Sequence, residues 1–145
     1  MIYGIVLFCM VIFISLFLVG FVEKDTELSI KKIIEIESNG NPDAFNKHSQ
    51  ARGLMQVTPI VLIDWNNKHP HDCYIKKDLY TPSINIKIGT WYLKEEIPRL
   101  LKHYEIEDNI NNRIIAYNFG IGNMVNNRKL PEETKNYIKK YWGVI

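Results

Sequence analysis

Helix signals dominate residues 23–145, and no long run shows the two-residue alternation of a strand. We expect a first helix over residues 27–38, capped by Thr26. Two Thr-Pro dipeptides, at 58 and 81, each place proline just after a capping residue. They predict a short helix ending near residue 66 and a longer one from residue 82. The chain is therefore predicted to be mainly α-helical.

The second half of this region carries further breaks and caps. Pro98 is expected to kink or restart the long helix, which then continues through "RLLKHYE". Asp108 is expected to cap a helix that ends near Asn118, where "GIG" breaks the chain. A last helix follows Pro131. Stretches such as "SNGNPDAFNKHSQARG" are rich in turn-forming residues and are expected to be loops.

The first 22 residues, "MIYGIVLFCMVIFISLFLVGFV", contain no charged side chain. A helix of roughly 20 apolar residues spans a bilayer core. The segment lacks the basic residues and the good cleavage site of a secretory signal peptide. We therefore expect residues 1–22 to be a transmembrane anchor, with cleavage of an export signal as the alternative. Residues 23–145 are then a single domain.

Charge and cysteine content narrow the function classes only a little. The formal net charge is +2, which gives no argument for nucleic-acid binding. Cys9 lies in the apolar segment and Cys73 in the domain, so no disulfide is expected within the domain. The segment "HPHDC" (69–73) alternates its histidines and cysteine, which suits neither common zinc pairing. We expect a polar surface loop there.

The segment "IKKIIEIESNG" sets two glutamates two positions apart in an apolar run. Each residue of a helix turns by about 100°. A buried stripe at i, i+3, i+4 and i+7 therefore contains Ile30, Ile33, Ile34 and Glu37. We expect Glu37 to fall within this apolar arc and Glu35 to face solvent.

Two interpretations of Glu37 follow, and the periodicity does not choose between them. Glu37 lies at the end of the predicted helix, so its carboxyl group can reach solvent as an ordinary surface acid. Alternatively, the carboxyl group is held beside apolar side chains, which raises its pKa because burial disfavours the charged form. An acid that keeps its proton near neutral pH can donate it to a leaving group.

Several separated motifs resemble those of one enzyme family, in the family's order. They are "ESNGNPDA" (37–44), "ARGLMQVTP" (51–59), "NIKIGTWYL" (85–93) and "AYNFGIGNM" (116–124), followed by "LPEETKNYIKKY" (130–141). Together they resemble the lytic transglycosylases of the soluble-lytic-transglycosylase type, relatives of goose-type lysozyme. The resemblance implies a lysozyme-like, mainly helical catalytic domain.

The resemblance implies roles for the matching residues. Glu37 is implied to be the catalytic acid, with the Ser38 hydroxyl in contact with substrate or with the acid. Gln56 is implied to line a sugar-binding cleft, and Met55 stands where it can pack against a sugar ring. Ser38 also fits a helix-end role, and Gln56 also fits a hydrogen bond to loop backbone.

Three residues in the last motifs complete the implied site. Tyr117 is implied to hold its hydroxyl near Glu37, and Asn118 to help hold the cleft. Tyr137 matches a position of the terminal helix that belongs either to the cleft or to the core. Tyr117 also fits a core role, and Asn118 also fits a role in satisfying the backbone before "GIG".

The implied reaction is cleavage of peptidoglycan between N-acetylmuramic acid and N-acetylglucosamine, with no metal and no other cofactor. Most glycoside hydrolases use two carboxyl groups, whereas the motifs offer one, with Asp43 as a weak second. A single acid suits a lytic transglycosylase, which closes a 1,6-anhydro ring instead of adding water. The alternatives are a muramidase on the same fold and a catalytically silent peptidoglycan-binding protein.

With an uncleaved anchor, we expect a single-pass protein of the inner membrane whose domain faces peptidoglycan in the periplasm. Export followed by signal cleavage is the alternative. By analogy with the family, a compact tethered enzyme would suit the assembly of an envelope-spanning secretion or conjugation apparatus.

Overall fold

The computed structural model describes residues 27–126 and 128–144, and within these ranges the chain is helical and contains no strand. Two isolated bridges, Phe45 to Arg52 and Arg52 to Val57, are the β-type pairing seen there. The mainly α-helical prediction is confirmed. In chain order the elements are α2 (Ile30–Ser38), α3 (Pro59–Lys68), the 3-10 helix η1 (Lys76–Tyr80), α4 (Pro82–Trp91), the π-helix η2 (Tyr92–Glu96), α5 (Ile97–His103), α6 (Ile110–Phe119), α7 (Ile121–Val125) and α8 (Glu132–Trp142).

Helix α2 begins at Ile30, later than the sequence predicts. Ser29 is its N-cap, and the Ser29 hydroxyl accepts a hydrogen bond from the Lys32 backbone N–H. The predicted cap, Thr26, lies outside the described residues. The Ser29 N–H also donates to the Tyr141 hydroxyl at 2.8 Å, so the start of α2 is tied to α8. The cap at Ser29 is a local interaction, whereas the bond to Tyr141 is a long-range contact that the local sequence does not reveal.

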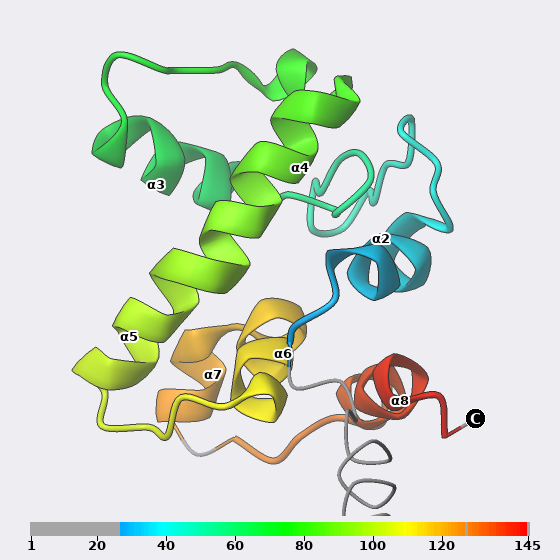
Figure 1. Cartoon of the computed structure of the whole chain (residues 1–145), viewed down its shortest axis with the longest axis vertical. Helices are drawn as coiled ribbons and strands as arrows, with labels where there is room; N and C mark the ends of the chain where they lie inside the picture. The colour runs from blue at the N-terminus through cyan, green and yellow to red at the C-terminus, as the bar shows by residue number, and fades with distance from the viewer. Residues whose placement is uncertain (1–26, 127, 145) are drawn as a thin grey trace, which may run out of the picture.

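The helix that starts at residue 82 runs past Pro98 without ending. Figure 1 shows α4 and α5 following one another along a single direction. Between them the Ile97 N–H donates to the Tyr92 carbonyl, so η2 is wound as a π-helix. Proline has no N–H and crowds the carbonyl four residues earlier, which here is the carbonyl of Lys94 within η2. The predicted kink takes the form of this wider turn.

Helix α6 is capped by Asn109 and not, as the sequence suggested, by Asp108. Asn109 Oδ1 accepts from the Asn112 N–H at 2.9 Å. Asp108 instead accepts from Arg113 Nη2 at 2.8 Å. Both residue types are good caps, so the pairing with Arg113 decides the outcome. After Phe119, Gly120 turns the chain at a φ of 87°, and α7 begins where only a break was predicted.

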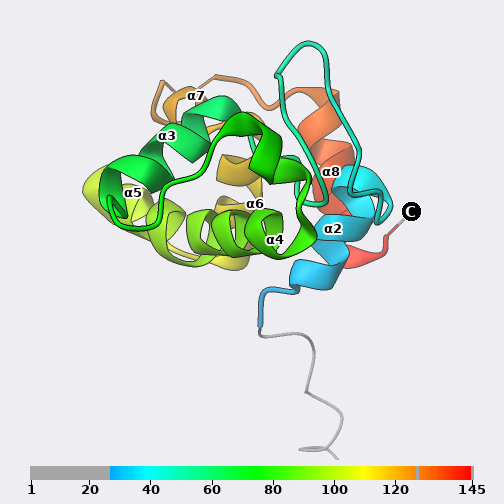
Figure 2. The ribbon, with the colours of Figure 1, turned by 90° about the horizontal axis from the view of Figure 1, so that it is seen from above.

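The core lies between these helices, and it positions α2 against α8. In Figures 1 and 2, α2 and α8 lie side by side at one end of the molecule, away from α3 and α5. The apolar side chains that are 0% exposed come from α2, the loop after it, η1, α4, η2, α5 and α6. They are Ile33, Met55, Leu79, Ile88, Leu93, Ile97, Leu101 and Ile114.

A buried asparagine on α4 fixes the loop that follows α2. Asn85 is 0% exposed, and its Oδ1 accepts from the Met55 N–H at 2.8 Å. Its Nδ2 donates to the carbonyls of Arg52 and Leu79 at 2.8 and 2.7 Å. A Cβ on Gly53 would stand 2.3 Å from this Nδ2, so only glycine fits there. The motifs "ARGLMQ" and "NIKIG" are therefore one packing unit.

The predicted anchor, residues 1–22, lies outside the described part of the chain. Among the helices that are described, none has the length and apolar character needed to span a membrane.

Candidate active site

Glu37 lies at the inner side of α2, near its C-terminal end. Glu35 is exposed, whereas Glu37 is only partly exposed, close to the fully buried Ile33. The predicted facing of the two glutamates is confirmed. The interpretation in which the Glu37 carboxyl escapes into bulk solvent does not hold.

The Glu37 carboxyl group is bonded to a tyrosine from α8. The Tyr137 hydroxyl donates to Glu37 Oε1 at 2.7 Å. Burial is the main reason that the pKa of Glu37 rises to about 7, while the hydrogen bond from Tyr137 lowers the pKa and the nearby charge of Glu133 raises it. Near neutral pH the carboxyl group is therefore divided between its acid and its ionised form, as a group that both gives and takes a proton requires.

Glu37 opens onto a cavity of about 380 Å³ between α2, α8 and the loop after α2. The cavity is rich in side-chain amides and charged groups and poor in apolar surface, which suits a polar ligand such as a sugar. Its lining residues are Ile36, Glu37, Asn46, Gln56, Asn118, Glu133, Asn136, Tyr137 and Lys140.

Gln56 is held so that its amide faces this cavity. Its backbone has a φ of 49°, in the left-handed region that few non-glycine residues adopt. Its Nε2 donates to the carbonyls of Gly53 and Ala44 at 3.0 and 3.2 Å. Because the nitrogen is engaged, the amide oxygen is the group that remains for a ligand.

Asn118 and Tyr137 are fixed by their neighbours in a similar way. The Asn118 Oδ1 accepts from the Thr134 hydroxyl at 2.7 Å, and Thr134 is 1% exposed. This bond leaves the Asn118 Nδ2 as its donor toward the cavity. Tyr137 is 6% exposed, so its ring belongs to the core while its hydroxyl reaches the cleft. The two alternatives for Tyr137 are thus both realised.

Three of the residues predicted for the site do not line the cavity. The Ser38 hydroxyl donates to the Leu54 carbonyl at 2.8 Å, so it joins the end of α2 to the loop and does not face a ligand. The Met55 side chain is 0% exposed and has no surface to offer a sugar ring. The Tyr117 hydroxyl donates to the Met55 carbonyl at 2.7 Å. Ser38 and Tyr117 hold the loop that carries Gln56, because each donates to a carbonyl of that loop, and Met55 anchors the loop by packing in the core.

The direct tyrosine partner of Glu37 is Tyr137, whereas the resemblance implied Tyr117. Tyr117 lies near enough for the charge of Glu37 to contribute to its raised pKa, although burial is the larger cause. Tyr117 therefore supports the site indirectly, through the hydrogen bond from its hydroxyl to the Met55 carbonyl.

Sequence reasoning missed the polar side chains that α8 adds to the cavity. Glu133, Asn136 and Lys140 line it together with Tyr137. These four residues stand at i, i+3, i+4 and i+7, so they share one face of a helix. This spacing was the available signal. Asn46, from the loop after α2, carried no comparable pattern.

A larger cavity, of about 650 Å³, lies beside α6 and Trp142, and both of its acids are engaged in ion pairs. Hydrogen bonds from Arg113 are the main reason that the pKa of Asp108 is lowered, so this carboxyl group stays ionised. Glu27, whose side chain is 90% exposed, pairs with Lys94. The carboxyl group whose pKa rises to about 7 lies in the other cavity, that of Glu37.

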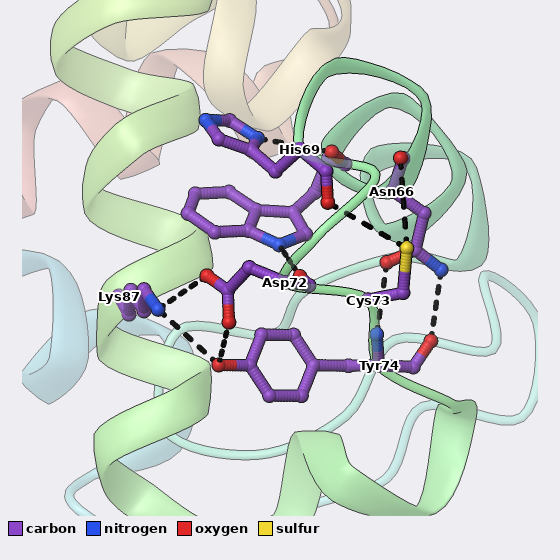
Figure 3. A network of polar contacts seen from close by, with 7 residues as sticks. Asn66, His69, Asp72, Cys73, Tyr74 and Lys87 are labelled. Atoms are coloured by element: carbon purple, nitrogen blue, oxygen red, sulfur yellow. Dashed lines mark hydrogen bonds and ion pairs between the residues drawn. The ribbon is translucent and has the colours of Figure 1, made fainter.

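The "HPHDC" segment braces α3 against α4, as Figure 3 shows. The His69 ring stacks on Trp65 of α3 at 3.8 Å between centroids. The Tyr74 hydroxyl donates to Asp72 Oδ1 at 2.6 Å, and Lys87 of α4 pairs with the same carboxylate. In the part of the chain that the structure describes, no three His, Cys, Asp or Glu side chains are grouped so that they could hold a metal ion.

A helical domain that presents a partly protonated acid, a tyrosine hydroxyl and side-chain amides to one cavity has the equipment for acid catalysis on a sugar. Comparison with family models gives the family. The model of the Transglycosylase SLT domain matches residues 23–140, and the chain belongs to this family. The resemblance seen in the motifs is confirmed. Membership indicates cleavage of glycosidic bonds by a transglycosylase-type enzyme, with peptidoglycan as the substrate class. A search among curated proteins gave no significant match.

Proposed function

We propose that the protein is a peptidoglycan lytic transglycosylase that cleaves the β-1,4 bond between N-acetylmuramic acid and N-acetylglucosamine. The product carries a 1,6-anhydro-N-acetylmuramic acid end, and Glu37 is both general acid and general base. The observation that carries this proposal is the Glu37 carboxyl at the cavity wall, with a pKa raised to about 7.

In the first step the protonated Glu37 gives its proton to the glycosidic oxygen. The bond from this oxygen to C1 of the muramic acid breaks, and the glucosamine leaves as an alcohol. The N-acetyl oxygen of the substrate stabilises the positive charge that develops at C1, which replaces a carboxylate nucleophile. The Tyr137 hydroxyl, 2.7 Å from Oε1, stabilises the Glu37 carboxylate that remains.

In the second step the Glu37 carboxylate removes the proton from the C6 hydroxyl of the same sugar. The C6 oxygen attacks C1 and closes the 1,6-anhydro ring. Glu37 is protonated again, and no water is consumed. The amide oxygen of Gln56 and the Nδ2 of Asn118 bind polar groups of the sugars, because their other amide atoms are already bonded to the protein.

Hydrolysis is the second candidate function, and Glu133 is the observation that favours it. Glu133 and Glu37 line the same cavity from two different helices. An inverting hydrolase needs such a second carboxylate to activate water on the far face of the sugar. The sequence offered only Asp43 for this role. Glu133 makes muramidase activity the nearest rival.

We propose further that residues 1–22 hold the enzyme at the inner membrane, with the domain in the periplasm. The support is the uncharged sequence of this segment. An envelope-spanning secretion or conjugation apparatus is proposed as the setting by analogy with the family alone. Cell fractionation tests the anchor: the chain should stay with the membrane and be open to protease from the periplasm. Soluble chain in the periplasm would instead indicate signal cleavage.

Mass spectrometry of peptidoglycan digests tests the reaction. The wild-type protein should release anhydro-muropeptides. Glu37→Gln should reduce release at least ~100-fold, the scale of a lost general acid. Glu107→Gln, at an exposed glutamate that does not line the cavity, is the matched control. Products with reducing ends would establish the muramidase. Binding to peptidoglycan without any release would establish a silent binding protein. A Glu37→Gln variant that releases muropeptides at a rate within tenfold of the wild-type rate would exclude Glu37 as the acid.

A further inference from the structure

A second cavity adjoins the Glu37 cavity, further along the contact between α2 and α8. Its volume is also about 380 Å³. Ile36 of α2 and Lys140 of α8 line both cavities. The two cavities therefore meet at this pair of side chains, one from each helix. We call the combined feature the α2–α8 groove. The lining residues of the second cavity are Lys32, Glu35, Ile36, Lys140, Tyr141, Trp142 and Gly143.

The second cavity differs in charge from the cavity that holds Glu37. Glu37 and Glu133 bring two carboxyl groups to the first cavity, where Lys140 is the one ammonium group. The second cavity has the reverse balance, with the ammonium groups of Lys32 and Lys140 against one carboxylate, Glu35. The α2–α8 groove thus changes from acidic to basic along its length. A ligand that fits both parts is polar near Glu37 and carries negative charge beyond Lys140.

The two lysines of the second cavity differ in how they are engaged. The Lys32 ammonium lies 5.4 Å from the centroid of the Tyr141 ring, a cation–π contact. Lys140 is exposed and makes no ion pair or hydrogen bond with the described residues. By contrast, the ammonium group of Lys135, on the same helix, pairs with Glu132 at 3.0 Å. Lys140 is therefore the cation at the junction that can accept a carboxylate from a ligand.

We propose that the α2–α8 groove binds the peptide stem of the muramic acid unit, with Lys140 pairing with a stem carboxylate. This inference rests on the proposed function, because the stem hangs from the same sugar whose glycosidic bond Glu37 would cut. The stem carries free carboxylates, so its charge matches the basic part of the groove. Ile36 and Trp142 give its apolar side chains a surface.

The second cavity has room for the first part of a stem. Along the end of α8 it runs from Lys140 to Gly143, which at 1.5 Å per residue is roughly 5 Å. An extended peptide advances by about 3.4 Å per residue, so about one or two stem residues lie along this length.

The test compares Lys140→Glu with Lys139→Glu in the full chain. Lys139 is exposed on the same helix and lines neither cavity, so its variant makes the same charge change outside the groove. The substrates are glycan strands that carry tetrapeptide stems and the same strands stripped of stems by an amidase. Initial rates at several concentrations give kcat and KM for each pair.

For Lys140→Glu we expect the KM on peptide-bearing strands to rise by about tenfold, the scale of one lost charge-assisted hydrogen bond. The preference of the enzyme for peptide-bearing over stripped strands should fall by the same factor, while Lys139→Glu keeps the wild-type preference. Equal losses on both substrates, or identical behaviour of the two variants, would overturn the inference and leave the proposed function intact. A wild-type protein that releases nothing from either substrate would overturn both.

Discussion

At the scale of single residues, the chemistry depends on the pKa of Glu37, which three features of its surroundings change. Burial raises the pKa of the carboxyl group, the Tyr137 hydroxyl lowers it, and Glu133 raises it again. Tyr137 and Glu133 come from the same helix but act in opposite directions. After burial, the largest cause, the pKa of Glu37 is therefore adjusted by α8, about 100 positions further along the chain than the acid itself.

Separate substitutions of Tyr137 and Glu133 should move the pH dependence of activity in opposite directions. In Tyr137→Phe the ionised form of Glu37 loses its donor, so its pKa rises and the alkaline limb of kcat/KM moves to higher pH. In Glu133→Gln a nearby negative charge is lost, so the pKa falls and the limb moves to lower pH. Tyr104→Phe, at an exposed site on another element, is the control. Shifts of the same sign in both variants would contradict the assignment.

The pattern along α2 predicted which glutamate turns inward, because helical periodicity is a local property. The partners of the acid could not be predicted in this way. The Ser38 and Tyr117 hydroxyls donate to loop carbonyls, and those bonds depend on a loop path that no periodic pattern describes. The resemblance supplied the correct set of motifs and implied a Tyr117 hydroxyl near Glu37, whereas the hydroxyl that is bonded to the carboxyl group comes from Tyr137.

At the scale of elements, the site depends on α4, although α4 contributes nothing to the cavity lining. Asn85 holds the loop through the Met55 N–H and the Arg52 and Leu79 carbonyls. Gly89, one turn later, allows Met55 to pack closely, since a Cβ there would stand 2.6 Å from the Met55 sulfur. The loop then presents Gln56 to the cavity.

Asn85→Ala should therefore lower both stability and activity. The change removes the partner of the buried Met55 N–H and of the buried Leu79 carbonyl, and each such group costs about 1–3 kcal/mol. The Arg52 carbonyl keeps its bond from the Val57 N–H. We expect a loss of roughly 3 kcal/mol or more in the free energy of unfolding, measured by denaturant titration. Asn126→Ala, which removes an exposed bond to the Gly122 carbonyl, should change it little. A variant at Asn85 as stable as the Asn126 variant would show that the loop holds without this anchor.

At the element level the sequence predicted helices more reliably than their ends. Asp108 and Asn109 are adjacent and can both cap a helix. Because Asp108 pairs with Arg113, Asn109 becomes the cap of α6. The prolines marked the starts of α3 and α4 because a fixed φ and a missing N–H act locally. Pro98 did not stop the helix, because η2 widened the turn before it.

At the scale of the whole molecule, the first and last described helices meet to form the site. Figure 2 shows α2 against α8 with the loop after α2 above them. The cavity is complete only when these two helices pack against each other, so activity requires the folded state of the whole domain. Keeping an acid in this position also has a cost in stability, and that cost depends on pH.

The pH dependence of stability follows from the raised pKa of Glu37. Its ordinary value is 4.5 and its folded value is about 7, so the folded state binds the proton more tightly. The resulting penalty is absent below pH 4.5, grows as the pH rises to 7, and is complete above it. Glu37→Gln should therefore stabilise the domain by up to about 3 kcal/mol at pH 8 and by little at pH 4.5.

Thermal unfolding at these two pH values measures the effect. Glu35→Gln is the matched control, because Glu35 is exposed on the same helix. It should change the stability little at either pH. A Glu37→Gln variant that is destabilised at pH 8, or that behaves like the control, would contradict the account of a buried acid.

The most direct measurement of the central claim is the titration of the Glu37 carboxyl carbon by 13C NMR. Its resonance can be assigned by its absence in Glu37→Gln. We expect a midpoint at about pH 7, well above the ordinary value of 4.5. A midpoint near 4.5 would mean that Glu37 is ionised throughout the neutral range, and it could not then be the proton donor.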